Sequence, residues 1–167
     1  MDIELSHPDH LTADFVGEPG QRTFYLQAGE SGDVVSVLVE KPQVAALADL
    51  LVRLLAGVGV EPVRAWDIVA MRLREPVTPR WRAGAIGVGI DPQLGRFVLE
   101  VSELVPEEDD REPEQVRIWA SEEQARTLAA HARWAVEQGR PTCRFCGLPI
   151  DPEGHTCPRM NGDARHP

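Results

Sequence analysis

The chain has 167 residues, of which 43% are hydrophobic, so it can fill one core with a small appendage better than it can form two independent domains. Its formal net charge of −10 argues against broad nucleic-acid binding, because proteins that contact the phosphate backbone usually carry a basic surface. No stretch approaches the ~20 apolar residues that span a bilayer, and no basic region followed by an apolar run opens the chain. We therefore expect a cytoplasmic protein without a membrane segment.

The first predicted elements are two strands and a helix. The strand-like runs TFYLQA (residues 23–28) and VVSVLV (residues 34–39) flank a turn, and Pro42 suits the first turn of a helix. The apolar side chains that follow recur at helical spacing, and Gly57 ends the pattern. This stripe consists of Val44, Leu47, Ala48, Leu51, Leu54 and Leu55.

The middle of the chain predicts a crossover and a hairpin. Residues 60–79 contain three prolines and suggest a connection between two halves, with one short strand over residues 68–73. WRAGAIGVGI (residues 81–90) alternates as a strand, and DPQLG gives a hairpin turn. The glycines of this strand do not form a dinucleotide-binding pattern, so small residues that let a helix approach the sheet explain them better.

A second set of strands and a helix follows. RFVLEVSELV (residues 96–105) and QVRIWA (Gln115–Ala120) predict strands, and Ser121 with Gln124 predicts a capping box at the start of a helix. Between these strands, residues 107–114 carry six acids and one arginine, which predicts a solvated loop or, as the alternative, an acidic docking patch.

An internal repeat links the two sets. The second helix has apolar positions at Ala125, Leu128, Ala129, Ala132, Ala135 and Val136, each 81 positions after its counterpart in the first stripe. The sequence therefore predicts an α+β fold, with an antiparallel sheet built from two strand-strand-helix units and both helices on one face. We expect residues 1–140 to form this domain and residues 141–167 to form a tail packed on it, while HPDH (residues 7–10) predicts an exposed N-terminal segment.

All three cysteines and one histidine lie within fifteen residues near the C-terminus. Cys143, Cys146, His155 and Cys157 provide three thiolates and one imidazole, which is the number and type of ligands that a structural zinc takes. A redox pair usually lies at a helix N-terminus, whereas prolines follow this one. A disulfide would leave one cysteine over in a chain expected to be cytoplasmic. Zinc is the favoured interpretation, with a redox or disulfide role as the alternative.

A second candidate site lies in GEPGQR (residues 17–22). Backbone N–H groups around Gly20 and Gln21, together with Arg22, form a pattern that holds an anion such as phosphate, with help from Arg82 or Arg96. A tight connection before a strand is the simpler explanation. The sequence shows no nucleophile paired with a base, so an enzyme is less expected than a binding protein.

Several stretches resemble an uncharacterised actinobacterial family, a domain of unknown function. They are VGEPGQRTFYLQA, VVSVLVEKPQVAALADLL, PVTPRWRAGAIGVGID and GHTCPRMNG, and the similarity covers nearly the whole chain. The resemblance implies that the gene belongs to a trio with a histidine-phosphatase-like protein and a protein that resembles phosphoinositide kinases. It implies no activity and no catalytic residue.

Two functions of different classes follow from the sequence. The first is a non-catalytic zinc-containing adaptor or regulatory protein that binds a protein partner, such as a kinase-like or phosphatase-like neighbour. The second is a phosphate-containing small-ligand binder or enzyme that uses the turn at residues 17–22. RNA binding through the tail is disfavoured, because residues 140–167 carry four arginines against three acids.

Overall fold

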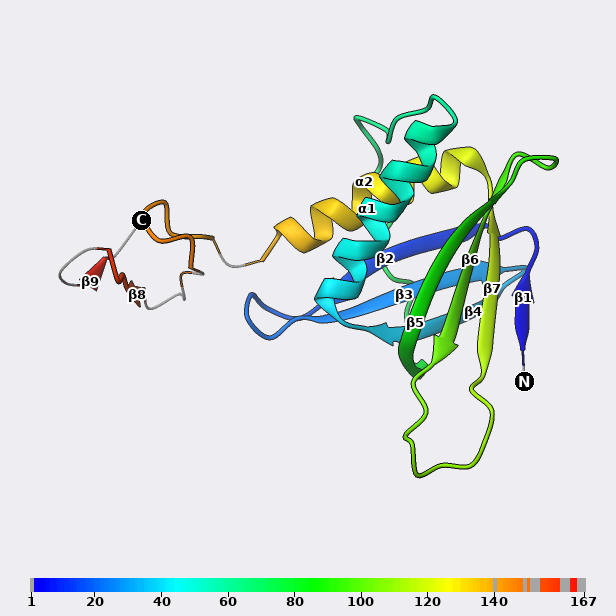
Figure 1. Cartoon of the computed structure of the whole chain (residues 1–167), viewed down its shortest axis with the longest axis horizontal. Coiled ribbons are helices and arrows are strands. Elements are labelled where there is room, and N and C mark those ends of the chain that lie inside the picture. The colour runs from blue at the N-terminus through cyan, green and yellow to red at the C-terminus, as the bar shows by residue number, and fades with distance from the viewer. Residues whose placement is uncertain (1, 140, 149, 151–153, 160–162, 165–167) are drawn as a thin grey trace.

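The computed structural model describes residues 2–139, 141–148, 150, 154–159 and 163–164. Within these residues seven strands form one mixed sheet in the order β1-β7-β6-β5-β4-β3-β2. Two helices lie together over one face of this sheet, and the tail extends from the end of the second helix (Figure 1). The fold is α+β, which confirms the predicted class.

The strands of the sheet are β1 (Ile3–Leu5), β2 (His10–Val16), β3 (Thr23–Glu30), β4 (Asp33–Val39), β5 (Pro79–Asp91), β6 (Arg96–Glu103) and β7 (Gln115–Ala120). The helices are α1 (Lys41–Gly57) and α2 (Glu122–Glu137). The tail contains a two-stranded antiparallel pair of β8 (His155–Thr156) and β9 (Asp163–Ala164).

The prediction of an antiparallel sheet was wrong, because two strand pairs are parallel. The first residues of β5 run beside β4 in the same direction, with Ser36 opposite Pro79, and β1 runs parallel to β7, with Glu4 opposite Arg117. A parallel pair needs a long crossover, and α1 with residues 58–78 provides it between β4 and β5. The remaining pairs in the sheet are antiparallel.

The prediction of an exposed segment at residues 7–10 is confirmed at His7 and Asp9 but was wrong at Pro8 and at His10. His10 begins β2, is 6% exposed and places Nε2 at 2.9 Å from Oε1 of Gln27. The side chains of Thr12 and Asp14 in the same strand are also buried. A strand that buries polar residues on one face lacks the apolar and polar alternation from which strands are predicted.

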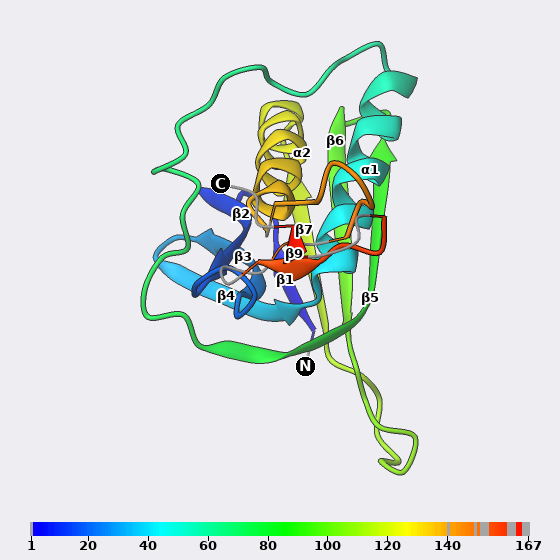
Figure 2. The ribbon, with the colours of Figure 1, turned by 90° about the vertical axis from the view of Figure 1, so that its left-hand side faces the viewer.

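Residues 68–71 form a turn and residues 72–73 belong to no strand, so the short strand predicted there was wrong. Asp67 Oδ1 accepts hydrogen bonds from the backbone N–H groups of Val69 at 2.9 Å and Ala70 at 3.2 Å, which is a turn that an aspartate side chain favours. The crossover then passes around the outside of β2 to β4 (Figure 2). There, Gln27 Nε2 donates to the carbonyl of Arg74 at 3.0 Å, and the backbone N–H of Arg74 donates to Oε1 of Gln27 at 2.7 Å.

The start signals of both helices are confirmed. Ser121 N–H donates to Oε1 of Gln124 at 2.9 Å, and Gln124 N–H donates to Oγ of Ser121 at 3.1 Å, which completes the predicted capping box. Pro42 lies in the first turn of α1. The helices contact each other and bury their predicted stripes, of which Val44, Leu47, Ala48, Leu51, Leu55, Ala125, Leu128, Ala129, Ala132 and Ala135 are in the core.

Two phenylalanines, Phe24 of β3 and Phe97 of β6, lie in the middle of strand triplets. Phe24 lies opposite Val39, and Phe97 lies opposite Ala120, which is 81 positions after Val39. On the other side of these strands, Phe24 lies opposite Phe15 and Phe97 lies opposite Ile90, which is 75 positions after Phe15. Both phenylalanines are buried in the same core, at 5% and 2% exposure.

The acidic segment forms the long connection between β6 and β7, which projects away from the sheet (Figure 1). At its base, Arg111 donates two hydrogen bonds of 2.7 Å to the carboxylate of Glu103. In the part of the chain that the structure describes, no helix has both the length and the apolar character needed to cross a membrane.

Candidate functional site

A tight turn in the tail places the first two cysteines of the predicted metal site. Gly147 N–H donates to the carbonyl of Cys143 at 2.8 Å, and Cys143 N–H donates to the carbonyl of Leu148 at 2.8 Å. Gly147 has φ of +75°, a left-handed conformation that a residue with a Cβ adopts at a cost. The turn therefore brings Cys143 and Cys146 to one side of the backbone.

The return segment brings the other two ligands to the same place. His155 lies in β8, where it pairs with Ala164 of β9, and Cys157 follows directly after this strand. The metal-ligating atoms of Cys143, Cys146, His155 and Cys157 all lie within 4.8 Å of one another. The structure thus assembles the predicted group of four and could hold a metal ion there.

The distances inside the cluster agree with a tetrahedral zinc site. Sγ of Cys143 and Sγ of Cys157 are 3.8 Å apart, and Sγ of Cys146 is 3.4 Å from Nε2 of His155. A zinc ion with Zn–S bonds of ~2.3 Å and Zn–N bonds of ~2.0 Å gives edges of about 3.5 to 3.8 Å between ligands. A disulfide would need the sulfurs at ~2.05 Å, well inside the observed 3.8 Å.

Two of the four residues in the cluster are buried, and Cys146 and His155 are half-buried. Cys143 is 2% exposed and Cys157 is 1% exposed, and together with Ile150 they form a small apolar cluster of their own, separate from the main core. A hydrogen bond from the backbone of Leu148 lowers the pKa of Cys146, but burial and the thiols of Cys157 and Cys143 raise it by more, so the net pKa is raised. A cation bound between the sulfurs would instead lower the pKa of Cys146, because it stabilises thiolates.

Comparison with known proteins identifies a family but no activity. Residues 3–157 match the model of a family described as a protein of unknown function (DUF3090). The chain belongs to this family. No curated protein and no solved structure gave a significant match. The match of this DUF3090 protein extends as far as Cys157, so it includes all four residues of the metal cluster.

The second predicted site coincides in part with a cavity of about 360 Å³ at the turn before β3. Gly20, Arg22 and Arg82 line it, whereas Gln21 does not. Arg96 is elsewhere and donates to the carbonyl of Trp119. The turn itself depends on Gly17, since a Cβ there would lie 2.6 Å from the carbonyl oxygen of Gln21.

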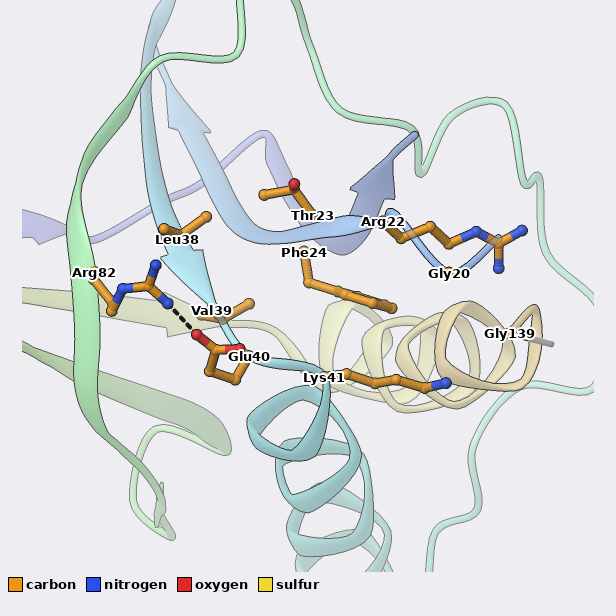
Figure 3. Close-up of a pocket in the computed structure, with 10 residues that line it drawn as sticks. All are labelled: Gly20, Arg22, Thr23, Phe24, Leu38, Val39, Glu40, Lys41, Arg82 and Gly139. Carbon is orange, nitrogen blue, oxygen red and sulfur yellow. Dashed lines mark hydrogen bonds and ion pairs between the residues drawn. The ribbon is translucent and has the colours of Figure 1, made fainter. Parts of the chain in front are cut away.

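Sequence reasoning identified only Gly20, Arg22 and Arg82 of this lining, and two of the residues that it missed lie at helix ends. Lys41, the first residue of α1, and Gly139, just beyond the end of α2, both line the cavity. Lys41 precedes the proline that starts one helix, and Gly139 is the glycine that ends the other. These signals predicted where the helices end, but they did not predict that the two ends lie close together. Figure 3 shows Arg22 and Lys41 on either side of the same opening.

The most deeply buried titratable group is His131 of α2, which is 0% exposed. Nδ1 of His131 accepts a hydrogen bond of 3.0 Å from Nε1 of Trp66, and Nε2 lies 3.6 Å from Oδ1 of Asp14. Because an indole N–H only donates, neutral His131 carries its proton on Nε2, facing Asp14. Its complete burial fits a role in packing the crossover against α2.

Proposed function

We propose that this protein is a non-catalytic, zinc-containing adaptor or regulatory protein that acts in the cytoplasm by binding a protein partner through its C-terminal tail. The observation that carries this proposal is the set of four ligand atoms within 4.8 Å of one another, two of whose separations are close to the edges of a tetrahedral zinc site. Four protein ligands fill a zinc shell and leave no position for substrate, whereas catalytic zinc sites usually have three. Such a metal orders the backbone around it.

Zinc is the metal that best fits this donor set. Three thiolates and one imidazole are soft or borderline ligands, which disfavour magnesium and calcium, and a tetrahedral arrangement favours zinc. His155 would bind through Nε2, the atom that lies 3.4 Å from Sγ of Cys146.

The metal-ordered turn carries two apolar side chains that suit a protein contact. Phe145 is 37% exposed and Leu148 is 49% exposed, and both lie within or next to the turn that holds Cys143 and Cys146. Aromatic residues at rigid positions supply much of the energy of protein interfaces. The partner's matching surface would then be an apolar patch, and the resemblance to a family with kinase-like and phosphatase-like neighbours suggests where to look for it.

Affinity capture from the native host tests the adaptor proposal. Wild-type protein should recover one partner at about equal amounts, and Phe145→Ser with Leu148→Ser should lose it while keeping the metal. Leu94→Ser is the matched control, because Leu94 is 63% exposed in the hairpin turn between β5 and β6 and should keep the partner. Recovery of the same partner with the double variant would contradict the proposal.

We further propose that the two halves of the sheet domain are structural repeats. The 81-position offset of the helix stripes is supported by the corresponding registers of Phe24 and Phe97 with their neighbouring strands. In this interpretation β1 and β2 together correspond to the long strand β5. Glu4 of β1 and Pro79 of β5 each lie in a parallel pair, and they are 75 positions apart. Phe15 of β2 and Ile90 of β5 are separated by the same 75 positions.

A further inference from the structure

The cavity at the turn before β3 has different chemistry at its two ends. Phe24, Val39 and Leu38 form an apolar floor between them. One end holds Arg22 and Lys41 beside Gly20 and Gly139, and the other holds Arg82, which forms an ion pair with Glu40 (Figure 3). The volume of about 360 Å³ falls within the range of small-molecule sites.

Arg22 is held in a fixed position at the first end. Its guanidinium carbon lies 4.2 Å from the centre of the Phe15 ring, and Nη1 donates to the carbonyl of Gln138 at the end of α2. Its Nε is buried and has no hydrogen-bond partner among the described residues. This nitrogen is closed to a ligand, so the guanidinium can meet one only through its other nitrogens. The contacts with Phe15 and Gln138 hold the side chain in place, so it loses little conformational freedom on binding.

Lys41 adds a second cation without a carboxylate partner. Its Nζ lies so close to Gly139 that a Cβ at that position would be 2.5 Å away, which places the ammonium at the same end of α2 as Arg22. Neither Lys41 nor Arg22 has an ion pair within the described part of the chain. Lys41 is also the first residue of α1, where the helix dipole favours a negative charge.

The charge of this cavity is opposite to that of the molecule. Its lining has three cations and one carboxylate, Glu40, whereas the whole chain has 17 basic and 27 acidic residues. The C-terminal carbonyls of α2 account for one contact of Arg22, and Glu40 pairs with Arg82. Arg22 and Lys41 are left without a carboxylate partner among the described residues. The surplus of positive charge in a concave site calls for an anion.

We propose that this cavity binds a small phosphomonoester, a function beyond that of an adaptor. The phosphate lies at the Arg22 and Lys41 end, where a guanidinium and an ammonium can each donate to its oxygens. The organic part lies over Phe24 and Val39 and reaches the ion pair of Arg82 and Glu40. This arrangement selects a monoester with a compact, partly apolar body over inorganic phosphate alone.

Calorimetric titration of the full-length, zinc-loaded protein with phenyl phosphate, inorganic phosphate and phenol tests this site. We expect phenyl phosphate to bind at least several-fold more tightly than inorganic phosphate, and phenol not to bind. Lys41→Gln should weaken phenyl phosphate binding about tenfold, the loss expected for one charge-assisted contact. Arg82→Gln should weaken it less, because Arg82 lies at the end of the cavity away from the phosphate and is paired with Glu40. Arg64→Gln is the matched control, because Arg64 is 91% exposed and lies outside the cavity.

A variant that should increase the affinity distinguishes ligand binding from helix stabilisation. Glu40→Gln removes the single carboxylate of the lining and frees Arg82, so it should strengthen phenyl phosphate binding several-fold. If Arg22 and Lys41 only stabilise the end of α2, phenyl phosphate will not bind to wild type at millimolar concentration, and the proposal is overturned. Equal weakening in Arg64→Gln would also overturn it, because binding would then follow net charge alone.

Discussion

Trp66 donates its indole N–H to Nδ1 of His131 at 3.0 Å, which joins the crossover after α1 to the buried face of α2. The two rings meet edge to face with their centres 6.2 Å apart, and His131 also packs against Trp134 at 5.0 Å. This contact fixes a segment that has no strand or helix of its own in residues 60–78.

We expect Trp66→Phe to destabilise the protein by about 1 to 3 kcal/mol, because it leaves a buried nitrogen acceptor without a donor. Urea unfolding of the two proteins measures the change. Trp119→Phe is the matched control, since Trp119 also donates an indole hydrogen bond, 2.9 Å to Glu4, but at an exposed position. An equal loss in both variants would show that ring volume, and not the hydrogen bond to His131, carries the effect.

The base of the acidic loop should respond to acid. The two hydrogen bonds from Arg111, followed by that from the backbone of Glu114, lower the pKa of Glu103 from 4.5 to about 2. A carboxyl with a lowered pKa stabilises the folded state above its unfolded pKa, and this contribution is lost as the pH falls from about 4.5 through about 2.

Carboxyl NMR titration checks this assignment. Glu103 should titrate near pH 2 in wild type, and Arg111→Gln should raise its pKa toward 4.5. Arg117→Gln removes a different surface arginine, one paired with Glu100, and should leave the Glu103 titration in place. A Glu103 midpoint that does not move in Arg111→Gln would refute the role of Arg111.

Burial lowers the pKa of His10 below 6.5, and the hydrogen bond with Gln27 only partly opposes this. Neutral His10 therefore supports folding above its unfolded pKa of 6.5, and this contribution is lost as the pH falls through the lower folded value. The unfolding free energy should decrease on acidification below 6.5, with a smaller slope in His10→Gln. His7→Gln, altered at an exposed histidine, should keep the wild-type slope.

The helix starts and the Cys-Cys turn of the candidate metal site were predictable because their signals are local. Ser121 and Gln124 lie three positions apart, and Cys143 and Cys146 lie in one turn. The role of β2 was not predictable, because Thr12 and Asp14 are buried by segments distant in sequence. The parallel pairing of β5 with β4 likewise depends on the path of the crossover, which no short pattern specifies.

The same distinction applies to the cavity. The neighbouring sequence made Arg22 and Arg82 candidate ligand-binding residues. Lys41 lines the same cavity only because the start of α1 lies close to the end of α2. The contact between these two helix ends depends on tertiary packing, and neither segment contains a sequence pattern that predicts it. The sequence therefore supplied part of the lining and could not specify its shape.

The repeat proposal makes a prediction about the core. Phe24→Ala and Phe97→Ala should each destabilise the protein by about 3 to 5 kcal/mol, because both remove a buried ring from an equivalent register position. Chemical unfolding should show losses within about 2 kcal/mol of each other, which is the usual spread between buried sites. A large loss at only one of the two positions would argue that the halves do not share their packing.

The metal cluster gives the strongest prediction about the tail. Purified protein should contain one zinc ion per chain, and Cys146→Ser should lose it, because three remaining ligands and an open position hold the metal far less tightly. His155→Gln should behave in the same way. His7→Gln, which removes a histidine outside the cluster, should retain the metal by elemental analysis.

Removal of zinc should unfold the tail before the sheet. Cys143, Ile150 and Cys157 form an apolar cluster separate from the main core, and a group this small cannot order a chain without its metal. A chelator should therefore expose the tail to limited proteolysis while the unfolding free energy of the sheet domain changes by less than about 1 kcal/mol, as expected for a locally unfolding unit. Retention of the tail against protease in metal-free protein, or a bond formed between Cys143 and Cys146 in native protein, would refute the structural role of zinc. The adaptor proposal would then lack the ordered surface that it requires. The proposal of phenyl phosphate binding at Arg22 and Lys41 would not be affected, because its titration tests it independently.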